Sequence, residues 1–153
     1  MDGVTLERAA LDEILAHARA THPEECCGFV IRRDGRDVVR RLTNVQTRLH
    51  QEHPDEVPRD GRAGYTPDPK ERIAAEREAE QPGASLKIIY HSHPVRGSYF
   101  SGEDRARAMF GDEPAYPDVV YVVVSDARLP GEARAFRWSD DARDFVETAL
   151  EVR

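Results

Sequence analysis

The sequence predicts an α/β (α+β) domain in which a mixed, curved β-sheet is flanked by helices. Helical and strand-like segments alternate loosely along the chain, and two pairs of strand-like runs are joined by short turns, as in hairpins. This pattern favours a mixed sheet over a doubly wound parallel one. A chain of 153 residues has about the length of one domain, so residues 1–153 are expected to form a single domain.

The first elements expected are a helix and a hairpin. Apolar residues recur every four positions from Leu6 to Ala18, which indicates an amphipathic helix with Thr5 as its N-cap. Two short β-favouring runs, Cys27–Arg32 and Val38–Leu42, flank an Asp-Gly pair. Apolar runs on both sides of Asp-Gly are typical of a β-hairpin.

A polar stretch and a second helix follow. The stretch from Gln46 to Tyr65 holds two prolines, two glycines and few apolar residues, and we expect a long surface loop there. Asp68 and Pro69 then open a helix, because aspartate is a good N-cap and proline suits the first helical position. This helix is expected to end before Pro82.

The next segments supply the centre of the sheet. Leu86–His93 is expected to be a buried strand that ends at a proline, and a helix is expected from Ser101 to Met109. The continuous apolar run Val119–Val124 is typical of a central strand covered on both faces.

The chain is expected to close with a strand and a helix. Ala133–Trp138 follows a Pro-Gly turn at 130–131 and is expected to pair with the central strand as a hairpin. The helical spacing of the apolar residues at 145, 149 and 152 predicts a last helix that begins at Ser139 or Asp140.

Charge and cysteine content limit the classes of function. The net charge of −7 argues against nucleic-acid or anionic-membrane partners, which select basic patches. The longest apolar run is far shorter than the roughly 20 residues of a membrane span, and the first residues carry acids where a signal peptide has bases. Cys26 and Cys27 are adjacent and cannot form an unstrained disulfide. A cytoplasmic protein is therefore expected.

The residues that carry chemistry follow the strand that ends at His93. His91 and His93 are two apart on a strand, so their imidazoles point to the same face. Asp104 lies 11 residues beyond His93, in the first turn of an expected helix. Two imidazoles, one carboxylate and a water form the arrangement of a catalytic zinc site. His-x-His alone is weak evidence, and Ser101-x-x-Asp104 alone equally indicates a helix cap.

Two motifs together resemble the JAMM (MPN-plus) metalloproteases. One is His-Ser-His-Pro, then six residues, then Ser-x-x-Asp; the other is Pro-x-Glu-x-Cys-Gly, with Glu25 in the glutamate position. The resemblance extends from the first helix to the Ala133–Trp138 strand, and it implies the cytidine-deaminase-like architecture of that family. The loop at Val95–Phe100 and the Gln46–Tyr65 stretch depart from the family pattern, which bears on substrate choice and not on the metal.

The resemblance also implies a role for each site residue. His91, His93 and Asp104 would hold Zn²⁺, and Glu25 would move a proton from the attacking water to the leaving amine. Ser101 would donate a hydrogen bond to the oxyanion. The residues themselves leave open whether the Ser101 hydroxyl serves the oxyanion or caps the helix.

Other candidate residues have ordinary explanations. His50 and His53 lack the i, i+4 spacing of a helical zinc motif, so a solvated loop is favoured over an incidental metal site. His17 and His22 lie near the end of the first helix, where a cation is common. Cys27 is expected to be a buried packing residue.

The function implied is a zinc-dependent peptidase or isopeptidase. It would hydrolyse an amide bond at the C-terminal tail of a small ubiquitin-like (sulfur-carrier) protein with metal-activated water. Aromatic residues at Tyr99 and Phe100 would line the tail groove or pack beneath the loop.

The alternative is a zinc-containing module that binds a ubiquitin-like partner without turnover, against which the intact Glu25 and Ser101 argue. A zinc deaminase is disfavoured because its Pro-Cys-x-x-Cys segment is missing. The oligomeric state is left open.

Overall fold

The computed structural model describes residues 3–126 and 131–153. The elements of these ranges, in chain order, are β1 (Val4–Leu6), α1 (Arg8–Thr21), β2 (Cys27–Arg33), β3 (Arg36–Leu42), α2 (Gln46–Glu52), α3 (Pro69–Ala79), β4 (Ala84–His93), α4 (Gly102–Ala108), β5 (Met109–Phe110), β6 (Glu113–Pro114), β7 (Val120–Ser125), β8 (Glu132–Ser139), β9 (Asp144–Thr148) and β10 (Leu150–Val152).

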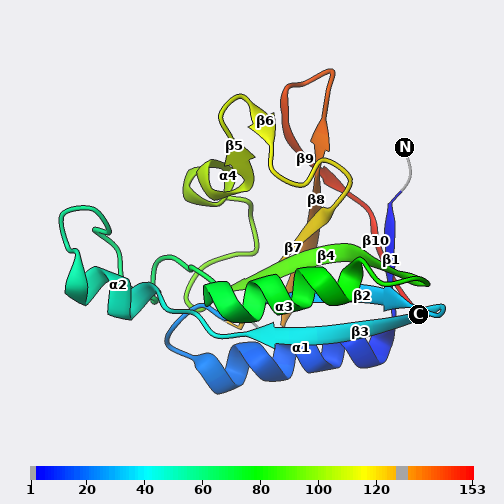
Figure 1. Cartoon of the computed structure of the whole chain (residues 1–153), viewed down its shortest axis with the longest axis horizontal. Coiled ribbons are helices and arrows are strands. Elements are labelled where there is room, and N and C mark those ends of the chain that lie inside the picture. Colours follow the sequence, from blue (N-terminus) through cyan, green and yellow to red (C-terminus); the bar gives the residue numbers. More distant parts are fainter. Residues whose placement is uncertain (1–2, 127–130) are drawn as a thin grey trace.

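Six strands form the main sheet, in the order β3-β2-β4-β7-β8-β9 (Figure 1). The central pair β4 and β7 is parallel, and the other neighbours are antiparallel, which confirms the predicted mixed sheet with Val119–Val124 at its centre. Two short ribbons complete the pairing: β1 with β10, and β5 with β6.

Helices cover both faces of this sheet. On one face α1 packs its buried Ala10, Ile14 and Ala18 against inward side chains of β4 and β7 such as Tyr90 and Val122. On the other face α3 packs against β2 and β4, and an apolar cluster continues towards α4 and β9. Alternation along β4 therefore sends Tyr90 to the α1 face and His91 to the α3 and α4 side.

Most local predictions are confirmed. The Asp34-Gly35 hairpin joins β2 to β3, and both turn residues have positive φ angles of 49° and 81°. Asp68 caps α3 by accepting a hydrogen bond from the backbone N–H of Glu71. Strand β8 pairs antiparallel with β7 as expected. Pro130, in the expected turn between them, lies outside the described residues.

The predicted last helix is wrong. Residues 144–152 form β9, which extends the sheet beside β8, and β10, which pairs with β1. Phe145 packs against Tyr121 and Trp138, with ring centroids 5.4 and 5.3 Å away. The apolar spacing fits a helix. In the structure Phe145 instead packs into the aromatic cluster from a strand, and the next residue of that strand, Val146, is exposed. Tertiary packing overrides the local pattern.

Two further predictions need correction. The Gln46–Tyr65 stretch is not a continuous loop, because its first part forms α2, and Asn44 supports the start of this helix by accepting a hydrogen bond from the N–H of Gln46. Thr5 does not cap α1: it lies in β1, and Glu7 occupies the N-cap position without a side-chain hydrogen bond. None of the helices in the described ranges is long and apolar enough to cross a membrane.

Candidate metal centre

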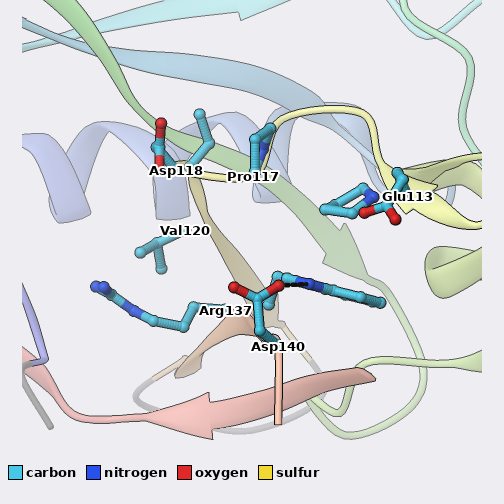
Figure 2. A pocket seen from close by; sticks show the side chains of 9 residues that line it. Glu113, Pro117, Asp118, Val120, Arg137 and Asp140 are labelled. Atoms are coloured by element: carbon cyan, nitrogen blue, oxygen red, sulfur yellow. Dashed lines mark hydrogen bonds between the residues drawn. The ribbon is translucent and has the colours of Figure 1, made fainter. Parts of the chain in front are cut away.

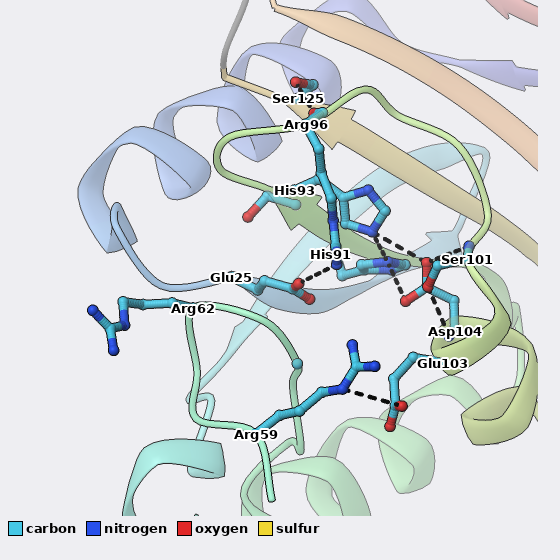
Figure 3. Close-up of polar contacts among 12 residues, drawn as sticks. Glu25, Arg59, Arg62, His91, His93, Arg96, Ser101, Glu103, Asp104 and Ser125 are labelled. Carbon is cyan, nitrogen blue, oxygen red and sulfur yellow. Dashed lines mark hydrogen bonds and ion pairs between the residues drawn. The ribbon is translucent and has the colours of Figure 1, made fainter.

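The end of β4 and the start of α4 bring three predicted donors together. Nε2 of His91 lies 3.0 Å from Oδ1 of Asp104, and Nε2 of His93 lies 3.1 Å from Oδ2 of the same carboxylate. The two Nε2 atoms are 3.3 Å apart. Figure 3 shows both imidazoles and the carboxylate converging on one point. All three side chains are buried.

Glu25 completes the cluster from the entry to β2. One donor atom from each of Glu25, His91, His93 and Asp104 lies within 4.8 Å of the others. The backbone N–H of Glu25 donates to the carbonyl oxygen of Gly61 at 2.7 Å, which fixes its position. Glu24 points elsewhere and accepts a hydrogen bond from Thr47. Of the two neighbouring glutamates, Glu25 is the one that faces the cluster.

The donor set fits a tetrahedral metal ion. Ligands at about 2.0–2.1 Å in a tetrahedron are themselves roughly 3.3 Å apart, close to the donor spacings given above. The ring N–H at Nδ1 of His93 donates to the carbonyl oxygen of Gly97 at 2.8 Å, which leaves Nε2 with its lone pair towards the cluster. Oε1 of Glu25 is buried and has no hydrogen-bond partner among the residues that the structure describes. These features match a site built to hold a cation.

Electrostatics inside the cluster point the same way. Burial lowers the pKa of His91, so its imidazole is held neutral, the form that ligates metals. For Asp104, burial alone would raise the pKa, but the electrostatic interaction with His91 and the hydrogen bonds with His91, His93 and the N–H of Ser101 outweigh burial and lower the pKa, so the carboxyl stays ionised. Burial, reinforced by the charge of Asp104, raises the pKa of Glu25 to about 8 despite the opposing Arg96.

Three side chains cover the four donors. Tyr65 stacks on His91 with ring centroids 4.6 Å apart, and Tyr99 packs edge-on against His93 at 5.2 Å. Arg96 donates from Nη2 to Oε2 of Glu25 at 3.0 Å. Tyr65 is buried, whereas Tyr99 and Arg96 are partly exposed. The donors are thus covered on one side by the buried Tyr65 and on another by the partly exposed loop that carries Arg96 and Tyr99.

Ser101 caps α4 through a reciprocal pair of hydrogen bonds. Its Oγ accepts from the N–H of Asp104 at 3.0 Å, and Oδ2 of Asp104 accepts from the N–H of Ser101 at 2.9 Å. The cap uses a lone pair of the hydroxyl and leaves its O–H free to donate. The two roles considered from the sequence are therefore compatible, because one needs an acceptor and the other a donor.

Asn44 is a supporting residue that the sequence does not single out. Its Nδ2 donates to the carbonyl oxygens of Glu25 and Gly64, at 2.9 and 3.1 Å. Its Oδ1 accepts from the N–H groups of Gln46 and Thr66, both at 3.0 Å. Asn44 thus ties the segment around Tyr65 to the strand entry that carries Glu25. Sequence patterns contain no signal for such a long-range contact.

The remaining sequence candidates lie outside the cluster. His50, on α2, shares a 2.7 Å hydrogen bond with the carbonyl oxygen of Val57, and neither it nor His53 joins a metal-binding group within residues 3–126 and 131–153. His17 is not the expected cation: burial and the charge of Arg41 lower its pKa to about 4, and its Nδ1 shares a 2.6 Å hydrogen bond with the Tyr90 hydroxyl. Cys27 is buried among apolar residues, as expected.

A separate cavity lies at the opposite end of the central strands. It has a volume of about 420 Å³ and is lined by residues that include Asp118, Val120 and Arg137 (Figure 2). Val120 begins β7, whereas Ser125 at its other end pairs with His93. This cavity therefore lies at the other end of β7 from the four donor side chains.

The fold and the cluster define a protein of the JAB/MPN class. Residues 7–139 match the model for prokaryotic homologues of the JAB domain, and the chain belongs to this family. This confirms the resemblance seen in the sequence. CysO-cysteine peptidases of Mycobacterium bovis and Mycobacterium tuberculosis are 30% identical over 137 residues, covering 86% of this chain and 80% of theirs.

Solved structures agree with the family assignment. A protein of Desulfitobacterium hafniense is 27% identical, with a TM-score of 0.69 over 97% of this chain and 92% of that one. A JAB1/MPN domain protein from Archaeoglobus fulgidus is 17% identical and covers both chains fully, with a TM-score of 0.56. The second likeness concerns the fold alone, and it supports the predicted architecture.

Proposed function

We propose that this protein is a zinc-dependent peptidase of the JAMM type, folded as a single domain over residues 1–153. The observation that carries the proposal is the buried convergence of His91, His93, Asp104 and Glu25. The match to the JAB family and the identity to the CysO-cysteine peptidases support it. The pairing of β1 with β10 supports the single domain, because it joins the two ends of the described chain.

Three residues of the cluster would hold the metal, and Glu25 would stay outside its ligand set. Zinc, when bound, polarises a carbonyl group and lowers the pKa of water to about 7. Glu25 accepts the water's proton and passes it to the nitrogen of the leaving amine. The Ser101 hydroxyl donates to the substrate's carbonyl oxygen as negative charge develops there. Asn44 and the carbonyl oxygen of Gly97 hold Glu25 and His93 in position.

The substrate we propose is an amide at the C-terminal tail of a small ubiquitin-like sulfur-carrier protein. The name of the mycobacterial relatives supports a carrier conjugated to an amino acid. A cavity of about 360 Å³ lies beside Tyr65 and is lined by aromatic and apolar residues that include Phe110 and Tyr116. Because Tyr65 also stacks on His91, this cavity offers a place for an extended tail next to the cluster.

The decisive experiment uses the zinc-loaded protein and sulfur carriers extended beyond their Gly-Gly end. Intact mass after incubation reports whether the extension is removed. Loss of the extension, abolished by a chelator and restored by zinc, is the expected result. A carrier that binds the protein at low micromolar concentration and keeps its mass would instead favour a binding module.

A further inference from the structure

Arg96 stands out among the basic side chains near the cluster, because its guanidinium touches Glu25. We infer that Arg96 recognises the free α-carboxylate of the residue that leaves, so that the enzyme releases a single C-terminal amino acid. This inference rests on the proposed peptidase function and adds a specificity that the function does not require. An isopeptidase or an endopeptidase would need no such cation.

The hydrogen bonds of Arg96 leave it free to bind an anion. In the part of the chain that the structure describes, its guanidinium donates one hydrogen bond, from Nη2 to Oε2 of Glu25. The remaining N–H groups of its fork are available, and the side chain is 28% exposed. The backbone is held separately, because the Ser125 hydroxyl donates to the carbonyl oxygen of Arg96 at 2.5 Å. The guanidinium can therefore bind a ligand while the loop stays in place.

The distances place a leaving residue's carboxylate beside Arg96. To protonate the leaving nitrogen, an oxygen of Glu25 must come within about 2.6–3.2 Å of it. The carboxyl carbon of an amino acid lies two bonds from its nitrogen, roughly 2.5 Å away. Nη2 of Arg96 is already 3.0 Å from the Glu25 carboxylate. A terminal carboxylate at this point is within hydrogen-bond reach of the guanidinium.

Charge makes this contact selective. Asp104 is ionised, and Glu25 adds a second negative charge whenever it is ready to accept a proton, so a substrate carboxylate needs a cation beside it to enter. In an internal peptide bond the same position holds a neutral carbonyl group, and in a lysine isopeptide it holds a methylene chain. Neither can form the charge-assisted pair that guanidinium makes with carboxylate. Arg96 therefore favours substrates that end one residue beyond the cleaved bond.

Two other arginines near the cluster are poorer candidates. The guanidinium of Arg107, a residue of α4, lies 5.3 Å from the centroid of the Tyr65 ring, and within the described residues it forms no hydrogen bond with Glu25. Arg59 pairs with Glu103 at 3.7 Å. In Figure 3, Arg96 reaches Glu25 from the loop after His93, whereas Arg59 and Glu103 face each other apart from the cluster.

The experiment compares two conjugates that differ only at the terminal group. A sulfur carrier ending in Gly-Gly is joined to cysteine or to cysteinamide, and kcat/KM is measured for the zinc-loaded wild type, Arg96→Gln, Arg96→Lys, Arg107→Gln and Arg62→Gln. Arg62 is the matched control, because it is exposed and pairs with Asp60 outside the cluster. Melting temperatures check that each variant folds.

For the wild type, kcat/KM is expected to be roughly 10- to 100-fold higher for the cysteine conjugate, which has a free carboxylate, than for the cysteinamide conjugate. This is the range of one charge-assisted hydrogen bond in a partly buried site. Arg96→Gln should lose this preference by slowing cleavage of the cysteine conjugate more than that of the cysteinamide conjugate. Arg96→Lys should keep part of the preference, and the Arg107 and Arg62 variants should keep it in full. Calorimetry with metal-depleted protein should show the same acid preference in binding, again lost in Arg96→Gln.

Four results would overturn the inference, and they are distinguishable. Equal cleavage of acid and amide by wild type removes the carboxylate preference while the peptidase function stands. Equal slowing of both conjugates in Arg96→Gln means that Arg96 only steadies Glu25. If the preference is lost in Arg107→Gln and kept in Arg96→Gln, the carboxylate is bound by Arg107 and not by Arg96. If wild type cleaves neither conjugate, the proposed peptidase function fails as well.

Discussion

The side-chain amide of Asn44 donates to the carbonyl oxygen of Glu25 at 2.9 Å and, through the same nitrogen, to that of Gly64 at 3.1 Å. One side chain thereby fixes both Glu25, the proposed proton carrier, and the segment in which Tyr65 stacks on His91. Every hydrogen-bonding group of the Asn44 side chain has a backbone partner. We therefore expect this residue to govern the geometry of the site without touching the metal.

Asn44→Asp should destabilise the protein although the two side chains are almost equal in size. A carboxylate keeps the two accepting contacts but cannot donate, so it would face the carbonyl oxygens of Glu25 and Gly64 with negative charge. Unfolding by urea should show a loss of about 2–4 kcal/mol, because two donated hydrogen bonds are lost and the buried acceptors stay unpaired. Gln51→Glu, an exposed change on α2 with the same alteration in charge, is the control. An unchanged stability in Asn44→Asp would contradict the proposed role.

The metal site should depend on each of its three ligands. His91→Ala and Asp104→Ala are expected to reduce zinc content from one per chain to near zero, measured by elemental analysis after dialysis. Removing one ligand leaves a buried site with too few donors to hold the ion. His50→Ala is the control, because this histidine lies outside the cluster. Full zinc content in the double variant of His91 and His93 would refute the assignment.

Glu25→Gln should separate catalysis from metal binding. Glutamine keeps the size and the hydrogen-bonding capacity of the side chain but cannot accept a proton at neutral pH. Turnover should fall by at least roughly 10²–10⁴-fold, because the group acts in both proton transfers, while zinc content is kept. Glu24→Gln is a matched control one residue away, since Glu24 bonds to Thr47. Wild-type turnover in Glu25→Gln would exclude the mechanism.

The elements that the sequence predicts well are those with local signals. The Asp-Gly hairpin, the Asp68 cap and the apolar run of β7 each depend on neighbouring residues, and the structure confirms them. The two histidines also follow from local geometry, because strand alternation alone places His91 and His93 on one face. Asp104 joins them because its helix begins a short loop later.

The predictions that fail depend on distant contacts. Phe145 has helical spacing with the residues that follow it, but its aromatic partners come from β7 and β8. The α2 segment is polar, and its start is stabilised by Asn44 from outside the helix. The four donor side chains are likewise covered by Tyr65 together with a loop that lies more than 30 positions further along the chain. No local sequence pattern predicts this contact.

His17 should make the fold sensitive to mild acid. Its pKa falls from 6.5 to about 4 in the folded state, chiefly through burial, so the folded protein binds fewer protons than the unfolded chain between these values. The stabilisation is complete above pH 6.5 and is lost as the pH falls towards 4, up to roughly 3 kcal/mol. Urea unfolding at several pH values should show this loss in wild type, and a smaller one in His17→Gln. Identical acid slopes in the two proteins would contradict it.

Ser101 allows its two roles to be measured separately. The hydroxyl caps α4 by accepting from the N–H of Asp104, and its O–H remains free to donate to the substrate. Ser101→Ala removes both functions, so stability should fall by about 1 kcal/mol and turnover by about 10²–10³-fold. Ser101→Gly removes the hydroxyl but tolerates the N-cap position, with a stability cost of only a few tenths of a kcal/mol. It should therefore keep the melting temperature near that of wild type and still lose turnover, with zinc retained. Ser101→Thr keeps the hydroxyl and should restore both. If Ser101→Gly turns over a confirmed substrate at the wild-type rate, the hydroxyl serves the helix alone, and another donor must stabilise the developing charge.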